Sequence, residues 1–195
     1  SLIEFKAYGG ILVLGSLFLL NLENILRRNY GSIGLFVGTL VLSLSVFLPN
    51  NSGSQSLLEF MPLWLVTSMI TAQDRLNWYR MTITLQSGVP FKLFYANFVG
   101  VLVFLLGNFG TRLVGLISFK EMFRERILSY ILILSIVLPL LFIQKGNGWN
   151  IVQFLYYGLF IMAIFAGMAM DKIFKKIPKI AGFGVGAAIV LLTIP

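Results

Sequence analysis

The sequence predicts an all-α fold, a polytopic transmembrane helical bundle with about six spans and one short helix that does not cross the membrane. Hydrophobic residues make up 58% of its 195 residues and charged residues only 11%, whereas soluble domains are roughly half apolar and a quarter charged. The mean hydropathy is +0.91, and apolar segments alternate with short polar breaks. Backbone at membrane depth must satisfy its own hydrogen bonds, which favours helices throughout.

Each predicted span is an apolar segment that ends at basic or turn-forming residues. In chain order the six spans are residues 8–26, 33–48, 93–117, 127–143, 151–170 and 180–194. Glu23, with Asn21 and Asn24, is interpreted as a polar cluster at the end of the first span. Residues 57–70 are also apolar, but this segment has 14 residues and contains Glu59 and Pro62. A span needs about 20 residues, so we expect residues 57–70 to form a short interfacial or re-entrant helix.

The distribution of basic residues favours one topology. If residues 57–70 do not cross, nine basic residues fall in loops on one side, against five on the other. If they do cross, the loops that follow change sides and the counts become six and eight. Lysine and arginine accumulate on the cytoplasmic side, so the first arrangement is expected. It places residues 49–91 in one extracytoplasmic excursion and both chain ends outside.

Charge and composition also limit the partners and the chemistry. The net charge is +8, and in a membrane protein such charge sets topology and contacts anionic headgroups. We therefore expect membrane lipid as a partner and no nucleic acid. The chain contains neither cysteine nor histidine, which removes thiolate chemistry and the commonest base and metal ligand. No metal site or cofactor is predicted, and acid–base work would fall to carboxylates, lysines or tyrosines.

The ends of the chain suggest an excerpt. Residue 1 is serine, no signal-peptide pattern follows it, and Pro195 closes an apolar segment. We interpret residues 1–195 as a single transmembrane domain and an internal piece of a longer protein.

The first candidate site is the polar break "QKGNGWN", residues 144–150, and the helix that follows it. Its glycines allow a tight turn between two helices, and Asn150 is expected to cap the next helix. Asn150, Gln153 and Tyr157 have the spacing of one helix face. Together with Lys145 they predict a site for a phosphate or another anion. The candidate substrate-binding residues here are Lys145, Trp149, Asn150, Gln153, Tyr156 and Tyr157. Packing with an interfacial aromatic belt explains the same residues equally well.

The second candidate site lies in the excursion, in "ITAQDRLNWYR". Asp74, Arg75 and Arg80 stand beside Trp78 and Tyr79, and arginine is suited to forked contacts with phosphate. A diphosphate and a sugar would find suitable partners there. A surface ion pair flanked by interfacial aromatic residues is the alternative interpretation, because such pairs are common and weak.

One block of the sequence carries a family resemblance. The segment "KGNGWNIVQFLYYGLFIMAIFAG", with the terminal "LLTIP", resembles a block in large bacterial membrane proteins of the GT-C superfamily, which are glycosyltransferases that use polyprenyl-phosphate sugars. The other spans are similar only in hydropathy. The resemblance implies that residues 144–150 face the extracytoplasmic side. The family's catalytic carboxylate usually lies in a large first external loop, and no matching motif is visible here, which implies a catalytic base outside this fragment.

On this basis the chain is expected to be the membrane core of a GT-C-like glycosyltransferase in a bacterial inner membrane. It would transfer a sugar from a polyprenyl-phosphate carrier to an extracytoplasmic acceptor, with Lys145 and Arg75 or Arg80 stabilising the leaving lipid phosphate. Two alternatives remain open at the level of sequence. A lipid-linked glycan flippase or transporter would need the same polar residues without the carboxylate, and the other alternative is a non-catalytic membrane scaffold.

Overall fold

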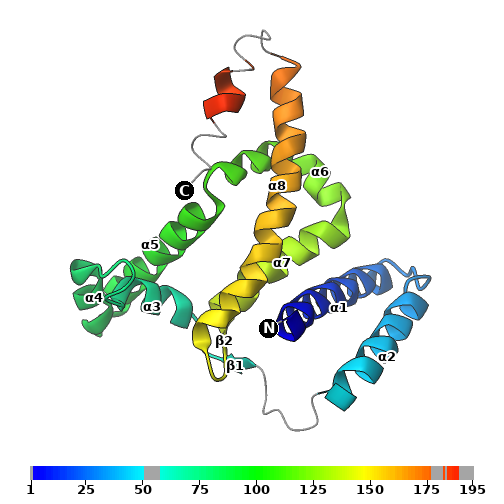
Figure 1. The fold of residues 1–195 in the computed structure, drawn as a ribbon, viewed down its shortest axis with the longest axis horizontal. Helices are drawn as coiled ribbons and strands as arrows, with labels where there is room; N and C mark the ends of the chain where they lie inside the picture. Colours follow the sequence, from blue (N-terminus) through cyan, green and yellow to red (C-terminus); the bar gives the residue numbers. More distant parts are fainter. Residues whose placement is uncertain (1, 51–57, 177–181, 183, 189–195) are drawn as a thin grey trace. The chain divides into compact units, whose positions relative to one another are not determined.

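The computed structural model describes residues 2–50, 58–176, 182 and 184–188 (Figure 1). The described residues are mostly helical and include one sheet of two short strands, which agrees with the all-α prediction. They belong to two compact units. The first unit consists of Ser1–Pro62 and Phe123–Gly158, and the second consists of Leu63–Met122 and Leu159–Pro195.

The first unit is built around a pair of helices, α1 and α7, that pack side by side (Figure 1). Its elements are α1 (Leu2–Leu26), α2 (Ile33–Asn50), β1 (Leu58–Phe60), α7 (Arg126–Leu141), β2 (Phe142–Gln144), the 3-10 helix η2 (Gly148–Ile151) and the start of α8 (Val152–Phe174). At one end of the pair, the Tyr8 hydroxyl of α1 donates a hydrogen bond to Oε1 of Gln144, just after α7. At the other end, the Tyr130 hydroxyl of α7 donates to Glu23 of α1. The two helices therefore run antiparallel.

The start of α8 completes the core of the first unit. Tyr8 is buried with its ring edge-on to that of Phe154, at a centroid distance of 4.8 Å. Gly158 allows α8 to approach α7 closely, because a Cβ atom at this position would lie 2.1 Å from the Ser135 hydroxyl oxygen. The lack of a side chain at Gly158 is thus what permits this contact between the helices.

The second unit is built on α5. Its elements are α3 (Trp64–Thr71), α4 (Tyr79–Gln86), α5 (Pro90–Phe109), the 3-10 helix η1 (Gly110–Ser118), α6 (Phe119–Arg124) and the larger part of α8. Both α3 and α4 pack on α5 (Figure 1). Gly100 lies against Val66 and Ile70, both buried, so α3 sits directly on the glycine surface of α5. Gly110, with φ of 48°, ends α5 because only glycine adopts this backbone conformation without strain.

Three stretches of the described chain, rather than six, are long and apolar enough to cross a membrane. They are Tyr8–Leu26, Pro90–Arg124 and Gly148–Phe174. Ile33–Ser45 and Arg126–Leu141 are apolar but shorter. α7 ends at Leu141, shortly after Pro139, and the chain then extends into β2. Proline has no backbone N–H to donate to the helix, which weakens the helix near its end. Most of the sixth predicted span, residues 180–194, lies outside the described residues.

The segment at 57–70, predicted to be a short helix, contains a strand as well. β1 pairs with β2 in antiparallel register, with Glu59 opposite Ile143. Pro62 follows, and α3 has only eight residues, which gives a length of about 12 Å. A helix of this length does not by itself cross a hydrocarbon core of about 30 Å. Residues 51–57 of the predicted excursion lie outside the described residues.

Candidate functional site

The loop that leaves β2 is arranged differently from the sequence prediction. Lys145 is exposed, and Gly146 has φ of 89°, a conformation that favours glycine. Oδ1 of Asn147 accepts a hydrogen bond from the Trp149 backbone N–H at 3.2 Å, so Asn147 caps the turn. The prediction that Asn150 is the cap is wrong. Asn150 lies inside η2, because a 3-10 turn precedes α8 and moves the cap towards the loop.

The polar face predicted for the following helix is also shorter than expected. Gln153 and Tyr157 lie in α8, but Asn150 belongs to η2 and does not continue their α-helical spacing. Gln153 and Tyr157 are half-buried and Tyr156 is exposed. The Tyr157 ring covers Gly9 of α1, where a Cβ atom would lie 2.9 Å from the Tyr157 hydroxyl oxygen. Tyr157 therefore contributes to helix packing, and a cavity wall formed by Gln153 and Tyr157 stays a prediction.

The sheet brings a carboxylate to this loop. Glu59 of β1 pairs with Ile143 of β2, and Lys145 follows Ile143 by two residues. Positions offset by two residues across an antiparallel pair are about 7–8 Å apart. Glu59 is exposed, and within the described part of the chain neither Glu59 nor Lys145 has an ion-pair partner. Phe60 and Phe142, on the opposite face, hold the strands together with ring centroids 5.6 Å apart.

Glu59 is not among the site residues predicted from the sequence. A strand of three residues is too short for an alternating pattern to be recognised, and its partner is distant in the chain. One signal was available, since "LEF" places a single carboxylate between two large apolar residues just before Pro62.

The candidate residues of the excursion belong to the second unit. Asp74 and Arg75 lie between α3 and α4, and both are exposed, with Oδ2 of Asp74 at 3.5 Å from Nε of Arg75. Arg80 is exposed in the first turn of α4. The Trp78 backbone N–H donates to the Ile70 carbonyl at 2.9 Å, which ties this loop to α3. Asp74 and Arg75 thus form the surface ion pair of the alternative interpretation, and binding of a diphosphate there stays a prediction.

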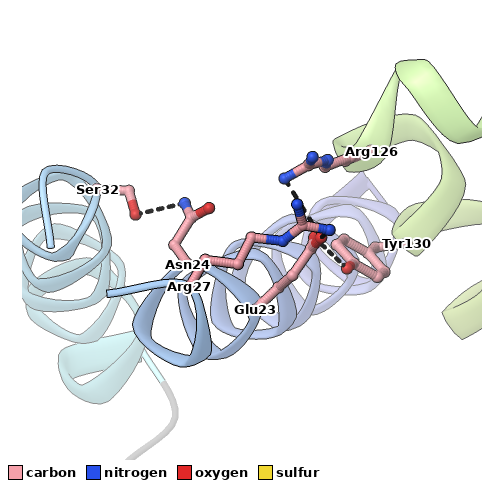
Figure 2. A network of polar contacts seen from close by, with 6 residues as sticks. All are labelled: Glu23, Asn24, Arg27, Ser32, Arg126 and Tyr130. Atoms are coloured by element: carbon pink, nitrogen blue, oxygen red, sulfur yellow. Dashed lines mark hydrogen bonds and ion pairs between the residues drawn. The ribbon is translucent and has the colours of Figure 1, made fainter. Parts of the chain in front are cut away.

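A polar network around Glu23, which was predicted only as a cluster at the end of a helix, joins α1 to α7 (Figure 2). Glu23 receives a hydrogen bond from the Tyr130 hydroxyl at 2.8 Å. Its Oε1 lies 2.8 Å from Arg27 and 3.3 Å from Arg126. Asn24, the next residue, donates to the Ser32 hydroxyl at 2.9 Å and so links α1 to the start of α2. The network fixes the ends of three helices.

No protein-family model matches the sequence, and neither a curated protein nor a solved structure matches it. The candidate site is therefore defined by its own geometry, which comprises an exposed lysine, a nearby carboxylate on a paired strand, and half-buried polar side chains in the first turns of α8.

Proposed function

We propose that this chain is the membrane core of a GT-C-like glycosyltransferase that moves a sugar from a polyprenyl-phosphate carrier to an acceptor outside the cytoplasm. The observation that carries this proposal is the pairing of β1 with β2, because it brings Glu59 close to the loop of Lys145. Sugar transfer of this kind needs both a base and a cation at one end of the membrane helices.

The two groups have complementary roles in the proposed reaction. In place of the base outside this fragment that the family resemblance implied, we assign this role to Glu59. Its carboxylate accepts the proton of the acceptor hydroxyl as the hydroxyl oxygen forms a bond to the anomeric carbon of the sugar. The bond between that carbon and the phosphate oxygen breaks, and its electron pair stays on the lipid phosphate. Lys145 stabilises this developing negative charge. Trp149 and Tyr156, beside the loop, offer ring faces for the sugar or the isoprenoid chain. Arg75 and Arg80 belong to the second unit, so a role for them in phosphate contact stays a prediction from the sequence.

The membrane arrangement that goes with this function has six spans. α7 has 16 residues, or about 24 Å, and three residues of β2 add about 10 Å. Together they are long enough for a core of about 30 Å, which supports a span that ends in a strand. Residues 33–48 and 180–194 would supply two more spans. The loop at 144–150 would then lie at the extracytoplasmic surface.

Binding and transfer by the reconstituted full chain test this proposal. Lys145→Ala should weaken polyprenyl-phosphate-sugar binding by about 1–3 kcal/mol, the loss of one charge-assisted contact. Lys92→Ala is the matched control, because Lys92 is an exposed lysine of α5. Glu59→Gln should preserve binding and abolish transfer of a radiolabelled sugar.

The outcomes separate the candidate functions. Equal lipid-sugar affinity in Lys145→Ala and the parent protein would remove the assigned role of Lys145. Normal binding with no transfer in the parent protein, but with movement of the lipid-linked sugar across vesicles, would favour a transporter. Full transfer activity in Glu59→Gln would place the catalytic base elsewhere.

A further inference from the structure

The first unit contains an open pocket of about 500 Å³ at the end opposite to the loop at 144–150. Leu20 and Asn24 of α1 form one wall of this pocket, and Arg124–Leu128, around the start of α7, form the other. Glu23 and Arg126, of the polar network in Figure 2, join the same two walls. The proposed transfer reaction uses none of these residues.

The charge of the pocket region is positive. Three arginines, Arg27, Arg124 and Arg126, outnumber Glu23 and Glu125. Glu23 interacts with both Arg27 and Arg126, so one carboxylate is shared between two guanidinium groups. A guanidinium has five N–H donors in a fork that suits phosphate. The arginines therefore keep donors available for an anion.

Arg124 is the more accessible of the two lining arginines. Its side chain is 74% exposed, and it approaches Glu125 only through Nε, at 3.5 Å. The terminal nitrogens of its guanidinium are therefore free for another oxygen. The Arg126 side chain is 40% exposed and is held towards α1 by Glu23. Arg126 is thus held by Glu23 of α1, and Arg124 is the more exposed of the two arginines.

Beside Asn24 and Glu125, the rest of the lining is apolar, and part of it lies in a candidate membrane span. Leu20, Ile127 and Leu128 line the pocket, and Leu20 lies within Tyr8–Leu26. Leu26, at the end of this stretch, is 78% exposed. Polar and apolar side chains thus lie side by side in this pocket, as the phosphate and the acyl chain do in a lipid. A free phosphate ion would gain nothing from the apolar side chains.

We propose that this pocket binds the headgroup phosphate of an anionic phospholipid. Arg124 and Arg126 contact the phosphate, and the first part of an acyl chain lies along Leu20, Ile127 and Leu128. Basic pockets between membrane helices bind anionic headgroups in this way. The net positive charge favours a lipid with net negative charge over a zwitterionic lipid, although both contain a phosphate.

Titration of the delipidated full chain in detergent, followed by native mass spectrometry, tests the site. The probes are dioctanoyl-phosphatidylglycerol, dioctanoyl-phosphatidylcholine and inorganic phosphate. Arg124→Gln should weaken phosphatidylglycerol binding about fivefold, the effect of one basic residue near an anionic headgroup. Arg124→Lys should retain most of the affinity, and Arg124→Glu should lose more than Arg124→Gln. Lys176→Gln, at an exposed lysine elsewhere in the chain, should bind as the parent does.

Three outcomes would overturn the proposal. The first is equal phosphatidylglycerol affinity in the parent protein, Arg124→Gln and Arg124→Glu, with unchanged helical circular dichroism in all three. The second is equally tight binding of phosphatidylcholine, which would show that charge does not select the ligand. The third is inorganic phosphate binding as tightly as the lipid, which would make this a site for free phosphate.

Discussion

Glu23 combines a hydrogen bond with two ion pairs, and two of these three contacts join α1 to α7. Its side chain is 22% exposed and meets a tyrosine hydroxyl and two guanidinium groups. A partly buried acceptor that serves several donors is costly to remove, because each donor then loses its partner. Glu23 is therefore expected to stabilise the pair of α1 and α7.

Thermal unfolding in detergent measures this contribution. Tyr130→Phe removes one hydrogen bond and should lower the free energy of unfolding by about 0.5–1.5 kcal/mol. Glu23→Ala leaves the hydroxyl and both arginines without this acceptor and should cost about 1–3 kcal/mol. Asp74→Asn is the control, because Asp74 is 75% exposed and exposed pairs contribute little. If Asp74→Asn destabilised the protein as much as Glu23→Ala, the network would have no special role.

At the level of single residues, the sequence predicted the kinds of residue in the site better than their positions. Lys145 and Gly146 lie in the loop as expected, because glycine and polar residues mark a turn directly in sequence. The cap is Asn147 and not the predicted Asn150. The two asparagines are three residues apart, and asparagine at either position is suited to begin a helix. Glu59 was missed because its position depends on pairing with a distant strand.

α8 has two glycines, one in close contact with a neighbouring helix and one in open surroundings. A Cβ atom at Gly158 would lie 2.1 Å from the Ser135 hydroxyl oxygen, and at Gly167 it would meet nothing within 4 Å. Ser135 is fully buried and its hydroxyl donates to the Leu132 carbonyl at 2.7 Å. It therefore has little room to move away from an added methyl group.

These two glycines give a matched pair of substitutions on one helix. Gly158→Ala should destabilise the protein by about 1–3 kcal/mol, because overpacking shifts α8 away from α7. Gly167→Ala should be neutral or stabilising by up to about 1 kcal/mol, since alanine favours the helix. Urea or thermal unfolding of both variants is the measurement. Equal stability of the two variants would contradict the close contact between α7 and α8.

Hydropathy predicted where the helices lie better than how each of them ends. The apolar segments at 8–26 and 151–170 correspond to α1 and α8. The segment at 93–117 begins as α5 but becomes a 3-10 helix after Gly110, and the segment at 127–143 ends in β2. Apolar composition is the same in an α-helix, a 3-10 helix and a buried strand, so hydropathy does not distinguish them.

At the scale of the whole molecule, the question is which end of the α1–α7 pair faces the cytoplasm. Contacts with Glu23 put Arg27 and Arg126 at one end, and the Tyr8–Gln144 hydrogen bond puts the start of α1 near the loop of Lys145 at the other. This separation agrees with the arrangement that the basic-residue count favours. Basic residues concentrate on the cytoplasmic side, so the arginine end is expected there and the loop at 144–150 outside.

Single-cysteine labelling tests the sidedness without background, because the chain contains no cysteine. In bacterial spheroplasts, a membrane-impermeant maleimide should label Ser54→Cys and Asn147→Cys at once, since both positions are predicted to be external. Arg28→Cys and Arg124→Cys should be labelled only after the membrane is opened. If Ser54→Cys and Asn147→Cys reacted from opposite faces, residues 57–70 would cross the membrane. If Arg124→Cys and Asn147→Cys both reacted in intact spheroplasts, α7 with β2 would not span it, and the proposed lipid pocket and the loop of Lys145 would share one surface.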